Sequence, residues 1–181
     1  MTNTDAPWRP SADDLADLTG CDHIELRPGG REEIVDGVSE GFPYALVYSQ
    51  HDRYQGRSVP WHWHQELELF YVLEGPVDYA TSHERLTLPT GSAGIVNANV
   101  LHMTHATDDG PNVNLLIHMF RPQLLAERDC LLWRRYVEPL IRETPVELVY
   151  DVPRGPEGET ALGGRVLAAF RTALARERGW E

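Results

Sequence analysis

Apolar and polar residues alternate with a period of two over the middle of the chain, from about residue 42 to 121. Short runs with this pattern are separated by clusters of Gly, Pro, Asp and Ser, which favour turns. The predicted strands are 44–49, 67–73, 77–81, 85–88, 93–96 and 112–120. Several short strands at this spacing predict a mainly β fold, an antiparallel double-sheet barrel or sandwich. In 67–73 both faces are apolar, so this strand should be central, with another element packed outside it.

The period becomes helical after Pro122, where leucines recur at roughly helical intervals as far as Pro139. Those leucines are Leu124, Leu125, Leu131 and Leu132. The helix that carries them could form a dimer seam or could cover the barrel, and the pattern does not distinguish the two. A second helix is expected from about 160 to 178, with Leu162, Val166, Leu167, Phe170 and Leu174 on one side.

The first forty residues are polar and contain one short helical pattern, which begins after Ser11 and has acidic residues in its first turn. The predicted organisation has three parts. Residues 1–41 form an N-terminal arm with a short helix, residues 42–121 form the barrel, and residues 122–181 form a helical appendage.

Candidate chemistry is concentrated in the segment GRSVPWHWHQELELFYVLEG, residues 56–75. His62 and His64 are two residues apart, so on a strand they face the same way. Glu68 would lie roughly 13 Å beyond His64 on a straight strand, at about 3.4 Å per residue. A shared ion therefore requires a tight turn or bulge near Gln65, which pairing of the next strand against the first would supply. His102, after a second turn, is the fourth candidate ligand.

Three imidazoles and one carboxylate suit a divalent transition metal, and Zn, Fe, Mn, Ni and Co all accept this set. The alternative is that His62, His64, Glu68 and His102 form the polar, hydrogen-bonded floor of a pocket for an organic ligand. Phe70 and Val72 share the face of Glu68 and should border the same cavity. His105 and His118 are further candidates for the pocket mouth, with a packed core position as the alternative for His118.

The spacing of these residues resembles the first motif of the cupin superfamily, G-x5-H-x-H-x3-E-x6-G, from Gly56 to Gly75. Residues 88–102 are similar to the second cupin motif, and His102 falls where its last ligand belongs. Gly91-Ser92 and Asn97-Ala98-Asn99 depart from that motif. The resemblance implies a cupin-type jelly roll followed by C-terminal helices.

A finer resemblance is to the N-terminal sensor domains of AraC-type transcription regulators. It rests on HWHQELELFYVLEG, IVNANVLHM, LLIHMFRPQLL and LLWRRYVEPLI. It implies an effector-sensing and dimerisation domain that binds a small molecule or a metal in the barrel and forms a homodimer. In that family the appendage continues into a DNA-binding domain, so we expect this chain to be truncated before one. The alternative is a metal-dependent cupin enzyme of oxygenase or isomerase type, although the helical tail favours a role without catalysis.

Charge limits the partners of this chain. Acidic residues outnumber basic ones by 28 to 16, and the net charge is −12. A nucleic-acid surface needs a basic stripe, so we expect no binding of nucleic acid through this chain alone. No apolar run approaches the length that spans a membrane, and the N-terminus lacks the pattern of a signal peptide. We therefore expect a cytoplasmic protein without a membrane partner.

Overall fold

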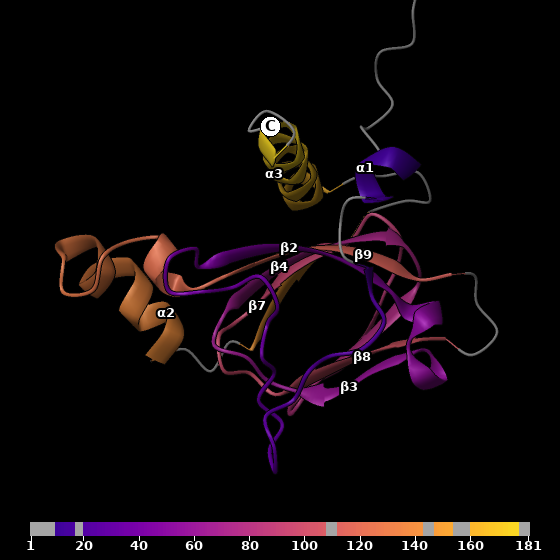
Figure 1. Ribbon diagram of the computed structural model, residues 1–181, viewed down its shortest axis with the longest axis horizontal. Coiled ribbons are helices and arrows are strands. Elements are labelled where there is room, and N and C mark those ends of the chain that lie inside the picture. Colours follow the sequence, from indigo (N-terminus) through magenta and orange to yellow (C-terminus); the bar gives the residue numbers. More distant parts are fainter. Residues whose placement is uncertain (1–9, 17–19, 108–111, 143–146, 154–159, 178–181) are drawn as a thin grey trace, which may run out of the picture.

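Two sheets face each other and form a barrel, with helices on its outside (Figure 1). The computed structural model describes residues 10–16, 20–107, 112–142, 147–153 and 160–177. The six-stranded sheet has the order β1-β2-β9-β4-β7-β10 and the four-stranded sheet the order β3-β8-β5-β6. All neighbouring strands are antiparallel except the two-residue β1, which pairs parallel with β2. The mainly β, double-sheet prediction is confirmed.

The bounds of the strands follow the chain order. They are β1 (Gly20–Cys21), β2 (Tyr44–Gln50), β3 (Ser58–His62), β4 (Leu67–Glu74), β5 (Val77–Thr81), β6 (Arg85–Leu88), β7 (Ala93–Val96), β8 (His102–Ala106), β9 (Asn114–Phe120) and β10 (Leu148–Asp151). The helices are α1 (Ala12–Ala16), α2 (Glu138–Arg142) and α3 (Ala161–Glu177). Shorter turns are η1 (His51–Arg53), η2 (Gln55–Arg57), η3 (Pro122–Leu124) and the π-helical turn η4 (Trp133–Val137).

Strand β4 lies between β9 and β7 and is apolar on both faces, as expected from its sequence. Its inward side chains Phe70 and Val72 belong to the core between the two sheets. Its outward side chains Tyr71 and Leu73 pack with Val166, Leu167 and Phe170 of α3. The element predicted outside this strand is therefore α3, which lies over the six-stranded sheet in Figure 1.

Strands β3 and β8 were not predicted from the sequence pattern. Their inward positions carry His62, His102 and Thr104, all buried, where a structural strand would carry apolar side chains. Polar residues at inward positions remove the alternation of apolar and polar residues that identifies a strand. The pattern also missed the two-residue β1 and the edge strand β10, but β3 and β8 are the missed strands that carry histidines of the cluster.

Helix α3 begins at a side-chain cap, in which the Thr160 hydroxyl accepts a hydrogen bond of 2.8 Å from the Gly163 amide. His118 on β9 connects the sheet to this helix. Its Nε2–H donates to the Val166 carbonyl oxygen at 3.2 Å, and its Nδ1 accepts from the Tyr44 hydroxyl at 2.7 Å. Burial lowers the pKa of His118, so the neutral ring that this geometry requires is favoured.

The appendage is helical over residues 131–142, but its buried face differs from the expected one. Trp133 and Val137 of its π-helical turn are buried. Leu124, Leu125, Leu131 and Leu132 are 51–71% exposed. These four leucines therefore do not cover the barrel, whereas Leu140 and Ile141 of α2 pack against its residues Leu67 and Phe120. The dimer seam stays a prediction. None of the helices in the described part of the chain is long and apolar enough to cross a membrane.

Candidate metal centre

The four predicted ligands come from both sheets of the barrel. His62 ends β3 and is paired directly with His102 at the start of β8. His64 follows in the connection between β3 and β4, and Glu68 lies on β4 in the opposite sheet. The expected bend near Gln65 is present, but its origin is different from the expected one. Strands β3 and β4 do not pair with each other, because the chain crosses from one sheet to the other between them.

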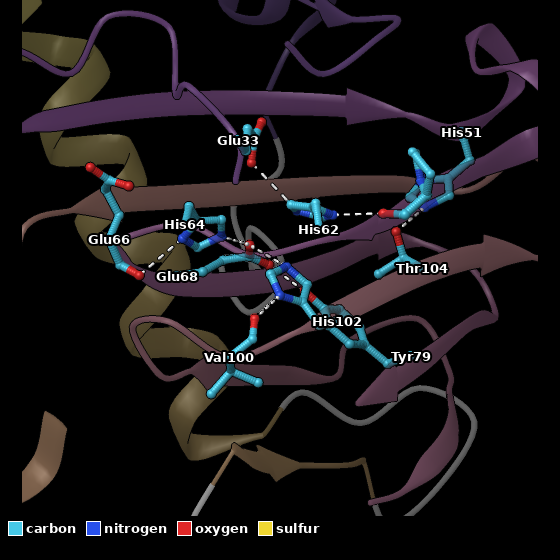
Figure 2. A network of polar contacts seen from close by, with 11 residues as sticks. Glu33, His51, His62, His64, Glu66, Glu68, Tyr79, Val100, His102 and Thr104 are labelled. Atoms are coloured by element: carbon cyan, nitrogen blue, oxygen red, sulfur yellow. Dashed lines mark hydrogen bonds and ion pairs between the residues drawn. The ribbon is translucent and has the colours of Figure 1, made fainter. Parts of the chain in front are cut away.

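This crossing brings the four side chains together inside the barrel (Figure 2). One ring nitrogen from each of His62, His64 and His102 lies within 4.8 Å of the other two. The Glu68 Oε2 atom is 3.3 Å from His64 Nε2 and 3.5 Å from His102 Nε2. All four side chains are buried, none more than 5% exposed.

The other ring nitrogen of each histidine is held by a backbone carbonyl oxygen. Nδ1–H of His62 donates to Pro60 at 2.8 Å, that of His64 to Glu66 at 3.0 Å, and that of His102 to Val100 at 2.9 Å. These three bonds fix the rings and direct each Nε2 toward the cluster. Metal-bound imidazoles are held by the same kind of outer hydrogen bond. The donor set therefore fits a divalent transition metal.

Glu68 is ionised in this cluster and is held on its other side by Tyr79. Burial alone would raise the pKa of Glu68, but hydrogen bonding with His102 and His64 outweighs it and holds that pKa well below its usual range. The Tyr79 hydroxyl donates to Glu68 Oε1. Burial and the Glu68 charge raise the pKa of Tyr79 well above normal, so it remains a donor. The Tyr79 ring stacks on Phe70, with 4.7 Å between centroids.

A second carboxylate, Glu33, reaches the cluster from the N-terminal arm (Figure 2). Its Oε2 atom is 3.4 Å from His62 Nε2, and its side chain is 13% exposed. Burial and the nearby Glu68 charge raise the pKa of Glu33 to about 7. Burial, with the neighbouring His102 and His64, lowers the pKa of His62 well below normal. No sequence pattern indicated Glu33, because it lies far along the chain from the motif and is placed by backbone contacts.

A cavity of about 530 Å³ lies between the arm, residues 22–38, and the barrel. Its barrel side includes Ala45 and Val47 of β2 together with Met119. Glu33 lines this cavity and also contacts His62, so the cavity is adjacent to the cluster. Four carboxylate residues line it, namely Asp22, Glu25, Glu33 and Asp36.

The remaining predicted pocket residues lie elsewhere. Phe70 and Val72 do share the face of Glu68, but they are fully buried in the core and do not line the cavity. His105 alternates along β8 with the buried His102, Thr104 and Ala106, so its side chain lies on the other face of that strand. His118 lies against α3, on the outer side of the six-stranded sheet. The structure therefore brings neither His105 nor His118 into the cluster.

A buried histidine near the cluster makes stability depend on pH. His51 is fully buried, and its Nε2 is 2.8 Å from the Thr104 hydroxyl. Burial lowers the pKa of His51 from 6.5 to about 4. Between these pH values the unfolded chain binds a proton at His51 that the folded chain does not. The contribution of neutral His51 to the free energy of unfolding is therefore fully present above pH 6.5 and is lost as the pH falls to 4. The loss attributable to His51 is about 3 kcal/mol.

We expect His51→Gln to remove this loss. Urea unfolding of the metal-free protein at pH 7, 5.5 and 4.5 gives the difference in free energy between wild type and variant at each pH. Between pH 7 and pH 4.5 the stability of the variant relative to wild type should rise by about 2.4 kcal/mol. An unchanged difference between wild type and His51→Gln would mean that His51 is not held neutral.

The Cupin domain family model matches residues 53–118, which include His62, His64, Glu68 and His102. A comparison with curated protein sequences gave no match. Among solved structures, the chain is similar to a cupin-2 domain containing protein from Shewanella frigidimarina, at 24% identity and a TM-score of 0.37, covering 46% of this chain and 76% of that one.

Two further solved structures each contain a bound small molecule. ToxT from Vibrio cholerae O395, bound to (E)-4-(8-methylnaphthalen-1-yl)but-3-enoic acid, matches at 9% identity with a TM-score of 0.48, over 75% of this chain and 49% of ToxT. HEPD from Streptomyces albus, with 2-hydroxyethylphosphonate and Fe(II), matches at 16% identity with a TM-score of 0.36, over 57% of this chain and 26% of HEPD. This chain thus spans about half the length of ToxT. Residues 53–118 thus match the Cupin domain model, and the two-sheet fold is of the cupin type.

Proposed function

We propose that this chain is the effector-sensing and dimerisation domain of an AraC-type transcription regulator, with a small-molecule cavity beside a metal centre. The observation that carries this proposal is the position of the cavity. It is walled by the N-terminal arm on one side and by the barrel on the other. A ligand in it would contact both parts at once.

The mechanism would be a shift between two populations of the arm. A ligand that contacts arm and barrel together has more favourable interactions when the arm is docked than when it is released. Docking of the arm would then change the surface offered to a partner subunit or to a DNA-binding region. Dimerisation itself would use the exposed leucines of residues 124–132.

The lining of the cavity indicates the chemical class of the effector. Its floor is apolar, with Ala45, Val47 and Met119, whereas carboxylates lie on its arm side. A negative ligand would be repelled by these groups, while a neutral or cationic ligand with an apolar body would be accepted. We therefore expect an amine or a neutral polar compound in preference to a carboxylic acid.

Hexylamine and hexanoate are a matched pair of probes, equal in size and opposite in charge. We expect hexylamine to slow amide hydrogen exchange in residues 24–38 and to raise the dimer fraction in sedimentation equilibrium. Hexanoate should do neither. A ligand that binds in the cavity but changes neither arm exchange nor dimerisation would contradict the sensor role.

The second candidate is a metal-dependent cupin enzyme of oxygenase or isomerase type. It is favoured by the cavity beside the histidines, because four protein ligands leave coordination positions of a six-coordinate ion for a substrate. In that case His62, His64, Glu68 and His102 would hold the ion. Turnover of a bound compound by the metal-loaded chain supports the enzyme, and tight binding without turnover supports the sensor.

A further inference from the structure

We propose that Glu33 is a fifth protein ligand of the metal centre, so that loading of the centre fixes the N-terminal arm against the barrel. This inference rests on the metal-binding part of the proposed function. It adds a carboxylate from outside the matched cupin segment, and it gives the arm a direct chemical connection to the cluster.

The arm is attached at the residue between the first two histidine ligands. The Trp63 amide donates to the Arg31 carbonyl at 2.9 Å, and the Glu33 amide donates to the Trp63 carbonyl at 2.8 Å. Glu32 also pairs with Trp63 as an isolated parallel bridge. The arm thus extends the end of β3 as a short extra strand, and this pairing places the Glu33 side chain beside His62.

Side-chain contacts of Glu32 hold the arm in the same register. Glu32 accepts a hydrogen bond of 2.9 Å from the Gln65 amide and forms an ion pair of 2.9 Å with Arg27. Glu32 therefore fixes the arm from outside the barrel, while Glu33, next to it, is directed inward. The two neighbouring glutamates have separate roles, which makes one a control for the other.

A cation between Glu33 and His62 would be bound by lone pairs of both side chains. Because His62 donates through Nδ1 to Pro60, its neutral ring presents a lone pair at Nε2. The Glu33 carboxylate presents lone pairs to that atom at 3.4 Å. Glu68 faces His64 and His102 at 3.3 and 3.5 Å in the same cluster. Two carboxylates with three imidazole nitrogens are a complete set of acceptors, and a divalent ion satisfies them all.

Neighbouring pairs in the cluster have distances close to those of ligands that share an ion. Among the described residues only the three histidine nitrogens all lie within 4.8 Å of one another, so Glu68 and Glu33 would move toward a shared ion. Two ligand atoms at right angles, each about 2.1 Å from an ion, are about 3 Å apart. The carboxylate-to-imidazole distances of 3.3, 3.4 and 3.5 Å are close to this value. A divalent ion with two carboxylates is also electrically neutral overall, whereas one carboxylate would leave a buried positive charge.

A set of three nitrogens and two carboxylates changes the expected metal. Structural zinc prefers four ligands in a tetrahedron, whereas five protein ligands favour a five- or six-coordinate ion. Carboxylate ligands suit Mn²⁺ well. Among the five candidate metals, Glu33 therefore favours those of higher coordination number over Zn²⁺.

The experiment titrates the metal-stripped full chain with Mn²⁺ alone by calorimetry, and follows hydrogen exchange of residues 24–34 with and without the ion. The variants are Glu33→Gln and the matched control Glu32→Gln. Gln has the shape of Glu and removes a buried charge, so metal-free Glu33→Gln should fold at least as well as wild type. Its thermal unfolding checks this.

We expect wild type to bind one Mn²⁺ and Glu33→Gln to bind it about 10- to 100-fold more weakly. Glu32→Gln should stay within about threefold of wild type. Mn²⁺ should slow exchange in residues 24–34 of wild type and of Glu32→Gln, but not of Glu33→Gln. Equal affinity of wild type and Glu33→Gln overturns the inference and leaves the four-ligand centre intact.

Two other outcomes are also decisive. Equal weakening by both variants means that the arm acts through its docking and not as a ligand, which overturns the inference. Wild type that binds no ion at all overturns the metal centre itself, and so the failure of the underlying proposal can be recognised separately.

Discussion

His102→Ala should lower the affinity of the chain for a divalent transition metal by at least about 100-fold. Loss of an outer hydrogen-bond partner alone costs a metal site 10- to 100-fold, and His102 offers its Nε2 directly to the cluster. The variant should also lose the stabilisation that the ion confers on the folded chain, which is about 2.7 kcal/mol at a metal concentration of 100 Kd. Calorimetric titration and thermal unfolding with and without metal measure the two effects.

The matched control is His105→Ala, on the same strand but on its other face. We expect this variant to bind metal as wild type does. Metal-free unfolding of both variants shows whether either substitution disturbs the barrel. Equal affinities for His102→Ala and His105→Ala would mean that any bound ion lies outside the cluster.

Phe70→Ala should lower the free energy of unfolding by about 3–5 kcal/mol, because it removes a fully buried aromatic ring from the core. The ring lies where Gly94 leaves room, since a Cβ on Gly94 would be 2.5 Å from the Phe70 ring. It also supports the Tyr79 ring, whose hydroxyl holds Glu68. We therefore expect weaker metal binding as a secondary effect.

Urea unfolding of the metal-free protein measures this cost. Leu131→Ala is the control, because Leu131 is 71% exposed and its truncation should change the free energy of unfolding by less than about 0.5 kcal/mol. A cost below about 1 kcal/mol for Phe70→Ala would show that the space around Gly94 is not filled as described.

The strands that the sequence predicts well are those whose inward residues are apolar. β5, β6 and β7 have the predicted bounds, and β4 extends one residue beyond its predicted end at Leu73. β3 and β8 escape prediction because His62, His102 and Thr104 occupy their inward positions. The polar side chains that form the site thus remove the sequence pattern that would identify its strands.

The approach of Glu68 to the histidines was predictable as a requirement, but its cause was not. The spacing of His64 and Glu68 along the chain indicates that the chain must bend between them. The bend itself is explained by the assignment of β3 and β4 to different sheets. Glu33 lay beyond sequence reasoning altogether. Its place depends on the backbone pairing of the arm with Trp63, which leaves no periodic signal. Likewise, the pattern assumed one regular helix after Pro122, whereas the structure has a 3-10 turn at Pro122–Leu124, helical residues from 131 and a π-helical turn at Trp133–Val137.

We infer that the inside of this barrel is a metal centre built on His62, His64, Glu68 and His102. Elemental analysis of purified wild type beside His62→Ala and Glu68→Ala is the decisive test. We expect about one divalent transition metal ion per wild-type chain and less than about a tenth of that in either variant. A metal-free wild type, or the same metal content in all three proteins, would contradict it.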